Sequence, residues 1–276
     1  MRALRTLFTP PSMDLELRGK RAVVTGSTAG IGLAIAVELA REGAAVVVNG
    51  RTAARVAEAM SRVRDRAPGA EVTGVAADLG TADGAARLLV AAPEADIVVN
   101  NVGIFEAKPF ADIPDEDWAR FLDVNVLSGV RLSRHHLPRM LQRRWGRILF
   151  ISSESALQIP AEMIHYGVTK TAQLGLARGM AELTRGTAVT VNAILAGPTR
   201  SEGVGQFVEG LARQRGIGAD EVERDFFREA RPTSLLQRFE TPEEIAALVT
   251  FVASERASGV NGAALRVDGG VVRAIV

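Results

Sequence analysis

One pair of side chains in the sequence has the types and the spacing needed for acid–base chemistry. Tyr166 is the only tyrosine of the chain, and Lys170 follows it four positions later. Only three of the 33 basic residues are lysines, so a lysine at this position indicates a task that arginine cannot perform. On a helix, residues four apart share a face, and a nearby ammonium lowers the pKa of a phenol. Such a phenol can give a proton to a carbonyl oxygen or take one from an alcohol.

Two further polar residues can complete a site around this pair. Ser152-Ser153 ends an apolar strand, and Ser153 stands thirteen positions before Tyr166. Its hydroxyl can polarise the same substrate oxygen, as an oxyanion donor does. Asn125 lies among apolar neighbours on a long predicted helix, 118–143. Taken alone, this setting favours the interpretation of Asn125 as a structural amide with satisfied hydrogen bonds over that of a catalytic group.

A glycine-rich turn near the start of the chain predicts a phosphate site. The turn follows a short apolar strand, opens a helix, and reads Thr25-Gly26-Ser27-Thr28-Ala29-Gly30-Ile31-Gly32. Glycines let the backbone approach a pyrophosphate, and the N–H groups at a helix N-terminus favour anions. We therefore expect a dinucleotide to bind against Gly26, Ser27, Thr28, Gly30, Ile31 and Gly32.

The end of the second predicted strand indicates which nucleotide is preferred. An acidic residue there would bond the ribose 2′-hydroxyl of NAD and repel a 2′-phosphate. This chain has Asn49 at that place and Arg51 just after it, with no acid. A guanidinium suits a phosphate monoester, so Asn49 and Arg51 predict NADP(H) in preference to NAD(H). Arg51 can also be one more solvated arginine, which leaves NAD open.

The elements that must position these residues alternate regularly along the chain. Apolar strand candidates, rich in Val and Ile and without polar alternation, occupy 21–25, 45–49, 71–76, 96–100, 147–152 and 189–195. Such runs are typical of strands buried on both faces of a parallel sheet. Alternation with helices predicts an α/β fold, a Rossmann-like doubly wound parallel sheet of about seven strands with helices on both faces.

Residues 14–276 are predicted to form a single domain, because no repeat or linker interrupts the pattern. Residues 1–13 show no pattern that would pack against the first strand, and they are expected to be an N-terminal tail. Residues 202–233 are too long for an ordinary connection and carry apolar residues at helical spacing, so we expect a substrate-binding lid. Thr241-Pro242 followed by two glutamates predicts a helix start.

Composition excludes several classes of function. The net charge is +1, which provides no electrostatic basis for nucleic-acid binding. The chain has no cysteine, so disulfides, zinc–cysteine sites and thiol catalysis are excluded. His135-His136 lacks further ligands at metal spacing, and no metal is expected. No apolar run is long enough to span a bilayer and no signal peptide is evident, so no membrane association and a cytoplasmic location are expected.

Taken together, the motifs resemble those of the short-chain dehydrogenase/reductase family over about residues 17–270. The glycine turn matches that family's Thr-Gly-x3-Gly-Ile-Gly pattern, and Asn100-Asn101-Val102-Gly103 is similar to its Asn-Asn-Ala-Gly motif. Asn125, Ser153, Tyr166 and Lys170 match its catalytic tetrad in order and spacing. The resemblance implies that Ser153 orients the substrate and that Tyr166 is the acid or base. It also implies that Lys170 holds the nicotinamide ribose and lowers the Tyr166 pKa, and that Asn125 positions a water that relays protons to this lysine.

The same resemblance implies further cofactor contacts. Asp78-Leu79 matches the adenine-contacting position of the family. The likeness of residues 100–103 to the Asn-Asn-Ala-Gly motif implies contacts from Asn101 and Gly103. After the sixth strand the family usually has Pro-Gly, whereas this chain reads Ala196-Gly197-Pro198-Thr199-Arg200-Ser201. Contacts to the nicotinamide amide are therefore assigned to Gly197, Thr199 and Ser201 despite this departure.

The implied function is hydride transfer between NADP(H) and a small ketone or secondary alcohol, of the carbonyl reductase or 3-oxoacyl reductase type. The alternatives are an NAD-dependent alcohol dehydrogenase and a non-catalytic dinucleotide-binding sensor or scaffold on the same fold. The expected substrate pocket is apolar and consists of Ile104, Phe105, Ile159, Met163, Phe207 and Phe226. A homotetramer, or a dimer, is expected from the family.

Overall fold

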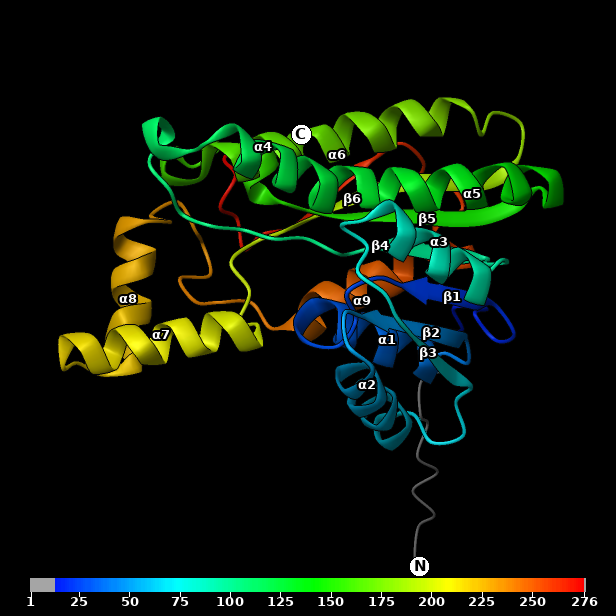
Figure 1. Cartoon of the computed structure of the whole chain (residues 1–276), viewed down its shortest axis with the longest axis horizontal. Coiled ribbons are helices and arrows are strands. Elements are labelled where there is room, and N and C mark those ends of the chain that lie inside the picture. The colour runs from blue at the N-terminus through cyan, green and yellow to red at the C-terminus, as the bar shows by residue number, and fades with distance from the viewer. Residues whose placement is uncertain (1–12, 276) are drawn as a thin grey trace, which may run out of the picture.

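A parallel sheet of seven strands forms the centre of the protein (Figure 1). The computed structural model describes residues 13–275, apart from the side chains of residues 206 and 207. The strand order is β3-β2-β1-β4-β5-β6-β7, and every pairing is parallel. The strands are β1 (Arg21–Val24), β2 (Ala45–Gly50), β3 (Val72–Ala76), β4 (Ile97–Asn100), β5 (Trp145–Ser153), β6 (Ala188–Ala196) and β7 (Ala264–Val267). The predicted doubly wound α/β fold is confirmed.

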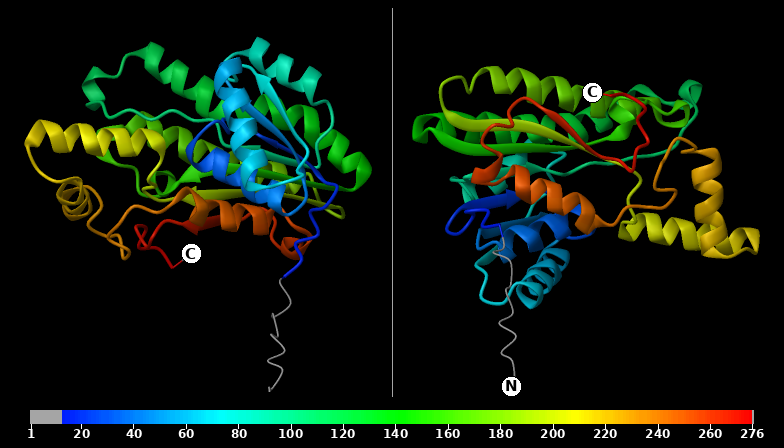
Figure 2. Two further views of the ribbon diagram at one scale, coloured as in Figure 1. Left: turned by 90° about the horizontal axis from the view of Figure 1, so that it is seen from below. Right: turned by 180° about the vertical axis from the view of Figure 1, so that it is seen from behind.

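Helices cover both faces of the sheet (Figure 2). One face carries α1 (Gly30–Arg41), α2 (Ala53–Arg66) and α9 (Pro242–Val252). The other carries α3 (Ala82–Ala91), α5 (Ser128–Arg143) and α6 (Ile164–Glu182), with α4 (Asp115–Leu122) preceding α5 in that layer. The strand order reverses between β1 and β4, and folds of this kind bind ligands at the carboxyl ends of the strands at such a point.

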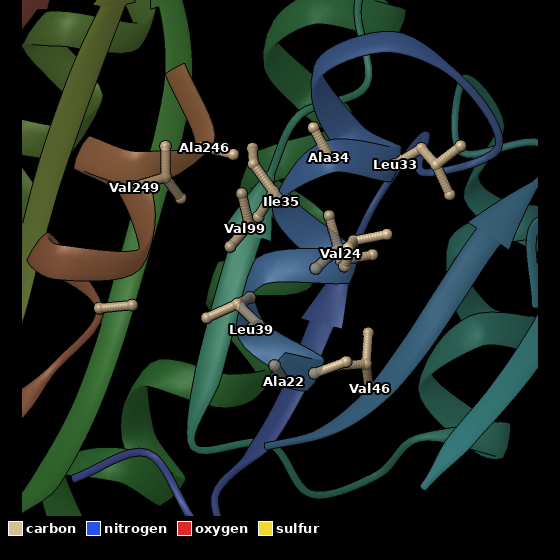
Figure 3. Packing of buried hydrophobic residues seen from close by; sticks show 14 of the residues in the cluster. Ala22, Val24, Leu33, Ala34, Ile35, Leu39, Val46, Val99, Ala246 and Val249 are labelled. Carbon is tan, nitrogen blue, oxygen red and sulfur yellow. The ribbon is translucent and has the colours of Figure 1, made fainter. Parts of the chain in front are cut away.

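The core explains why the strands lack polar alternation. Ala22 and Val24 of β1 pack in the cluster beneath α1 and α9, whereas Val23 packs in the cluster on the opposite face. Figure 3 shows the first cluster, with Leu39 of α1 and Val249 of α9 directed toward the strand residues. Successive side chains of a strand point to opposite faces, so burial of both faces requires apolar residues at every position.

Residues 202–233 form two helices, α7 (Glu202–Arg215) and α8 (Ala219–Glu229), which stand away from the sheet as an arm (Figure 1). The arm has its own apolar cluster, which includes Val208, Val222, Phe227 and Phe239. The rings of Phe226 and Phe239 stack with centroids 5.0 Å apart. The segment is therefore helical and amphipathic as expected, and its action as a lid stays a prediction. Of the expected tail, 1–13, only exposed Met13 lies within the described residues.

The long predicted helix, 118–143, is wrong in detail. It is divided into α4, a wide π-helical turn (Asp123–Leu127) and α5. Asn125 lies in the π-helical turn and is buried. Single π-turns inside helices often occur at functional sites, because they redirect one carbonyl and one side chain.

Candidate active site

The predicted catalytic residues converge at the carboxyl end of β5. Ser153 is the last residue of β5, and Tyr166 and Lys170 lie in the first turns of α6. The Lys170 Nζ donates to the Ile151 carbonyl oxygen at 2.9 Å and stands 5.6 Å from the centre of the Tyr166 ring. The structure therefore places the amine beside the phenol, as the spacing of the two residues predicts.

Burial changes the proton affinities of this pair. It raises the pKa of Tyr166 to about 12. Burial also lowers the pKa of Lys170 to about 8. Sequence reasoning expected the lysine to lower the phenol's pKa, but in this structure desolvation of the phenolate outweighs the neighbouring charges. Tyr166 is thus held as a neutral phenol, which is the form that donates a proton.

Asn125 is fixed by hydrogen bonds in the π-helical turn. Its Oδ1 accepts the Ile104 N–H at 2.8 Å, and its Nδ2 donates to Thr169 Oγ1 at 2.9 Å. The Asn125 carbonyl accepts Gln173 Nε2 at 2.6 Å, and Gln173 Oε1 lies 3.5 Å from the Lys170 Nζ. Gln173 therefore links the amine to the asparagine carbonyl. Sequence reasoning missed Gln173, although its position three residues after Lys170 puts both on one helix face.

Gly103 brings backbone close to these groups. A Cβ there would stand 3.3 Å from the Lys170 Nζ and 3.5 Å from Asn125 Oδ1. A side chain would therefore occupy the space in front of the amine. The absence of a side chain at Gly103 keeps this space open.

The glycine turn has the geometry of a phosphate cradle. A Cβ at Gly32 would stand 2.4 Å from Asn101 Nδ2, and Gly26 and Gly30 have φ values of +58° and +52°. Asn101 Nδ2 donates to the Thr25 carbonyl oxygen at 2.9 Å, which holds the turn against the end of β4. The first turn of α1 has no acidic residue, and no side chain caps its N–H groups. These free donors fit a pyrophosphate.

The other residues of the turn have different surroundings. Ser27 is buried and its Oγ donates to the Val24 carbonyl oxygen at 2.7 Å, whereas Thr28 and Ile31 are half-buried. Asn49 is also buried: its Oδ1 accepts the Gly26 N–H at 3.2 Å, and its Nδ2 donates to the carbonyl oxygens of Val75 in β3 and of Ala77 just after it. The Asn49 side chain thus braces the turn from within.

Arg51 and Asp78 lie at the open edge beyond these strands. Arg51 is exposed, and no acidic residue of the described part of the chain pairs with it. Thr28 packs closely on Gly50, because a Cβ at Gly50 would stand 2.3 Å from its methyl group. Asp78 is exposed with its Oδ1 accepting the Gly80 N–H, and Leu79 is buried. A free guanidinium beside the turn fits the expected 2′-phosphate contact.

The loop after β6 joins the arm to the glycine turn. The Gly197 N–H donates to the Val267 carbonyl oxygen at 2.7 Å, and Glu240 Oε2 lies 3.1 Å away. Thr199 Oγ1 donates to the Gly197 carbonyl at 2.9 Å. Ser201 caps α7, and its Cβ is 3.2 Å from where a Cβ of Gly30 would stand. Burial raises the pKa of Glu240 to about 7, and sequence reasoning missed this residue.

The expected apolar pocket is only partly assembled. Phe105 is exposed and meets Tyr166 edge-on at 6.4 Å between ring centroids, and exposed Ile159 packs on Gly167. Ile104 and Met163 are half-buried. Phe226 instead stacks within the arm, and the side chain of Phe207 lies outside the described residues.

A buried ion pair lies where an apolar wall was expected. Arg231 Nε donates to Glu154 Oε1 at 2.7 Å, directly beside Ser153. Sequence reasoning missed both residues. An acid immediately after Ser152-Ser153 was the available signal.

Residues 13–275 lack two features that other functions would need. They contain no cluster of three or more His, Cys, Asp or Glu side chains placed to hold a metal ion. None of their helices combines the length and the apolar character needed to cross a membrane.

A doubly wound sheet with this glycine turn before α1 defines a Rossmann-type NAD(P)-binding protein. The family model described as short chain dehydrogenase matches residues 20–211. The chain is 49% identical over 263 residues to the uncharacterized oxidoreductase YvaG of Bacillus subtilis, covering 95% of this chain and 100% of YvaG. It belongs to the short-chain dehydrogenase family and is an oxidoreductase.

Two characterised proteins are also similar. D-beta-hydroxybutyrate dehydrogenase of Cupriavidus necator is 36% identical over 260 residues, covering 93% of this chain and 99% of that protein. The crystal structure of L-sorbose reductase from Gluconobacter frateurii, complexed with NADPH and L-sorbose, superimposes with a TM-score of 0.89 at 32% identity, covering 95% of this chain and 100% of that one.

Proposed function

We propose that the protein is an NADP(H)-dependent carbonyl reductase that transfers hydride between nicotinamide and a ketone or secondary alcohol. The observation that carries this proposal is the grouping of Ser153, Tyr166 and Lys170 at the carboxyl end of β5, next to Gly103 and the glycine turn. The nucleotide would lie along Gly26–Gly32, Gly103 and Lys170, and it supplies the hydride.

The residues of the chain manage the proton and the substrate oxygen. Tyr166 carries the proton that a ketone oxygen needs as it becomes an alcohol, and the raised pKa keeps that proton in place until then. Ser153 positions the oxygen beside the phenol. Lys170, next to the phenol, stabilises the phenolate that remains, because an adjacent cation favours the charged form.

The preference for NADP(H) rests on Arg51. Replacing it by alanine removes a charge-assisted hydrogen bond, and such a bond contributes about 1.5–3 kcal/mol. We therefore expect Arg51→Ala to weaken NADPH binding roughly 10- to 100-fold and to leave NADH binding unchanged. Parallel titrations by thermal shift and by tryptophan fluorescence measure both affinities.

The matched control for this test is Arg185→Ala. Arg185 is an exposed arginine beyond α6, far along the chain from the turn, and pairs only with Glu182 among the described residues. A wild-type preference for NADH, or equal losses for both nucleotides in Arg51→Ala, would contradict the proposed NADP(H) specificity and support the NAD-dependent alternative.

The substrate class is proposed as small ketones and the matching secondary alcohols. The similar proteins named above act, by their names, on a hydroxy acid and on a keto sugar, which supports this class. A panel of aliphatic, cyclic, keto-acid and keto-sugar substrates, followed by loss of NADPH absorbance, tests it. Tight nucleotide binding with no turnover on any of these classes would favour the sensor or scaffold reading.

A homotetramer is proposed for the assembly. Apolar side chains stay exposed on the layer of α4, α5 and α6: Leu122, Leu127, Val168 and Leu183. Exposed apolar residues gathered on one layer are typical of a protein interface. Light scattering after size exclusion measures the mass, and a monomer would contradict this proposal.

A further inference from the structure

Glu154 is a buried carboxylate in direct contact with the serine of the site. Its side chain is 4% exposed, and it directly follows Ser153, the last residue of β5. Its Oε2 accepts the hydroxyl of Ser153 and, at 2.6 Å, the hydroxyl of Ser155. Its Oε1 accepts Arg231 Nε at 2.7 Å. Buried carboxylates are uncommon unless paired, and here the pairing reaches the reacting groups.

The counter-charge comes from the arm. Arg231 lies just after α8, and its side chain is 9% exposed. Its Nη1 donates to the Ala230 carbonyl at 2.8 Å and lies 3.4 Å from Glu162, whose side chain is half-exposed. A single ion pair therefore joins the base of the arm to the residue beside Ser153.

Counting donors and acceptors determines the direction of the Ser153 hydroxyl. An ionised carboxylate only accepts hydrogen bonds, so the Ser153 hydrogen points at Glu154. The Ser153 Oγ also accepts the Ser155 N–H at 3.1 Å. What Ser153 presents toward Tyr166 is then a lone pair, which can accept a hydrogen from the phenol or from a substrate alcohol, and not the donor to a carbonyl oxygen that the sequence predicts.

We propose that Glu154 is a positioning residue of this reaction: its carboxylate, held by Arg231 of the arm, takes the Ser153 hydroxyl hydrogen and so sets how Ser153 faces Tyr166 and the substrate oxygen. The inference rests on the proposed function. The Arg231–Glu154 ion pair couples the position of the arm to the hydrogen bond that Ser153 makes with Glu154. If Arg231 moves away, the Glu154 carboxylate loses its cation.

The substitution Glu154→Gln tests this arrangement with little change in volume. Arg231 can only donate, so it requires the amide oxygen, and the amide nitrogen then faces Ser153. The serine must now accept, and its hydrogen turns toward Tyr166. Loss of the negative charge and a new donor both favour the phenolate, because Glu154 raises the Tyr166 pKa in this structure.

Tyr166 can be observed directly because it is the only tyrosine of the chain. Protein labelled with carbon-13 at the tyrosine Cζ gives one resonance, whose shift reports ionisation and hydrogen bonding without any substrate. The charged groups around the phenol are Lys170 on its own helix, Glu154 after β5 and Arg231 from the arm. We expect Glu154→Gln to bring the onset of ionisation to lower pH by about 0.5–1 unit.

The partner variant gives the opposite sign. Arg231→Gln removes a cation that lowers the Tyr166 pKa, so the onset moves to higher pH, and the charge-balanced double variant returns toward wild type. The matched control is Glu162→Gln, which removes a carboxylate that contacts Arg231 but not Ser153. A second control, Ser155→Ala, removes the other hydroxyl on Glu154 and keeps the backbone donor.

Once an alcohol that the enzyme oxidises is known, the acid limb of the pH profile of kcat/KM should shift in each variant in the same direction as the Tyr166 ionisation. The affinity for NADP⁺ should stay unchanged. Equal shifts in Glu154→Gln and Glu162→Gln, or no shift in either, would overturn the proposal. If Arg231→Gln does not fold, the comparison of Glu154→Gln with Glu162→Gln decides alone. Absence of turnover in the wild type would count against the proposed function, whereas the resonance of Tyr166 tests Glu154 separately.

Discussion

At the scale of single residues, the site depends on where burial and charge compete. Tyr166 and Lys170 share a face of α6, and burial moves their pKa values apart, to about 12 for the phenol and about 8 for the amine. Desolvation disfavours the charged form of each group, which is the phenolate for tyrosine and the ammonium for lysine. The neutral phenol that results can donate a proton, as the proposed function requires of Tyr166.

The first prediction concerns this phenol. Tyr166→Phe removes the proton donor and keeps the ring that meets Phe105, so we expect kcat to fall by about 10²- to 10⁴-fold. Nucleotide binding should be unchanged, because the phenol is not needed to hold phosphates. Steady-state kinetics and a binding titration measure the two effects, and a variant that keeps wild-type kcat would rule out Tyr166 as the acid.

At the scale of elements, helix ends position the site. The loop Gly197–Ser201 lies against Glu240, and the next residue, Thr241, begins α9. Thr241 Oγ1 accepts the Glu244 N–H at 3.2 Å, and Glu244 Oε2 accepts the Thr241 N–H at 2.8 Å. This capping box confirms the helix start that Thr241-Pro242 predicts. The cap fixes the start of α9, whose apolar side chains pack with those of α1 in one cluster.

The second prediction tests this cap. Thr241→Ala removes the acceptor for the Glu244 N–H, and we expect the free energy of unfolding to fall by about 1 kcal/mol. Thr241→Ser keeps the hydroxyl and is the matched control, expected near wild type. Urea denaturation measures both, and equal losses in the two variants would show that the methyl group, not the cap, is what stabilises the helix.

At the scale of the whole molecule, buried titratable groups make stability depend on pH. His136 is 1% exposed, its Nδ1 has no partner among the described residues, and burial lowers its pKa to about 3. Glu240 acts in the opposite sense, because burial raises its pKa to about 7 and stability therefore decreases as pH rises from about 4.5 to 7. A variant that lacks one of the two groups, compared with wild type, separates the contribution of His136 to the pH dependence of stability from that of Glu240.

The third prediction is that His136 destabilises the fold in acid. Below its ordinary pKa of 6.5 the unfolded chain binds a proton that the folded chain does not, so stability falls as pH falls toward about 3. His136→Leu should reduce the loss of unfolding free energy between pH 6.5 and 4.5 by about 2–3 kcal/mol. Urea denaturation across this range measures it, with His135→Gln as control. An unchanged slope in His136→Leu would contradict the assignment.

Local pattern was enough to predict much of this protein. Apolar runs and helix periodicity indicated the parallel sheet. Spacing put Tyr166 and Lys170 on one helix face, and the family resemblance grouped them with Ser153 and the glycine turn. These features are encoded within a few turns or one strand, because helix and strand geometry relate sequence spacing directly to distance. The cap at Thr241 was also predictable from local sequence, because it joins residues three positions apart.

Only the tertiary structure decided the rest. Glu154 and Arg231 are 77 positions apart, and Gln173 reaches the Asn125 carbonyl across 48. No local spacing relates such pairs, because their distance depends on how the arm and the helices pack on the sheet. The raised pKa of Tyr166 and the burial of the Asn49 side chain also depend on the tertiary structure. Burial and partners in space determine them, and both exist only once the chain has folded.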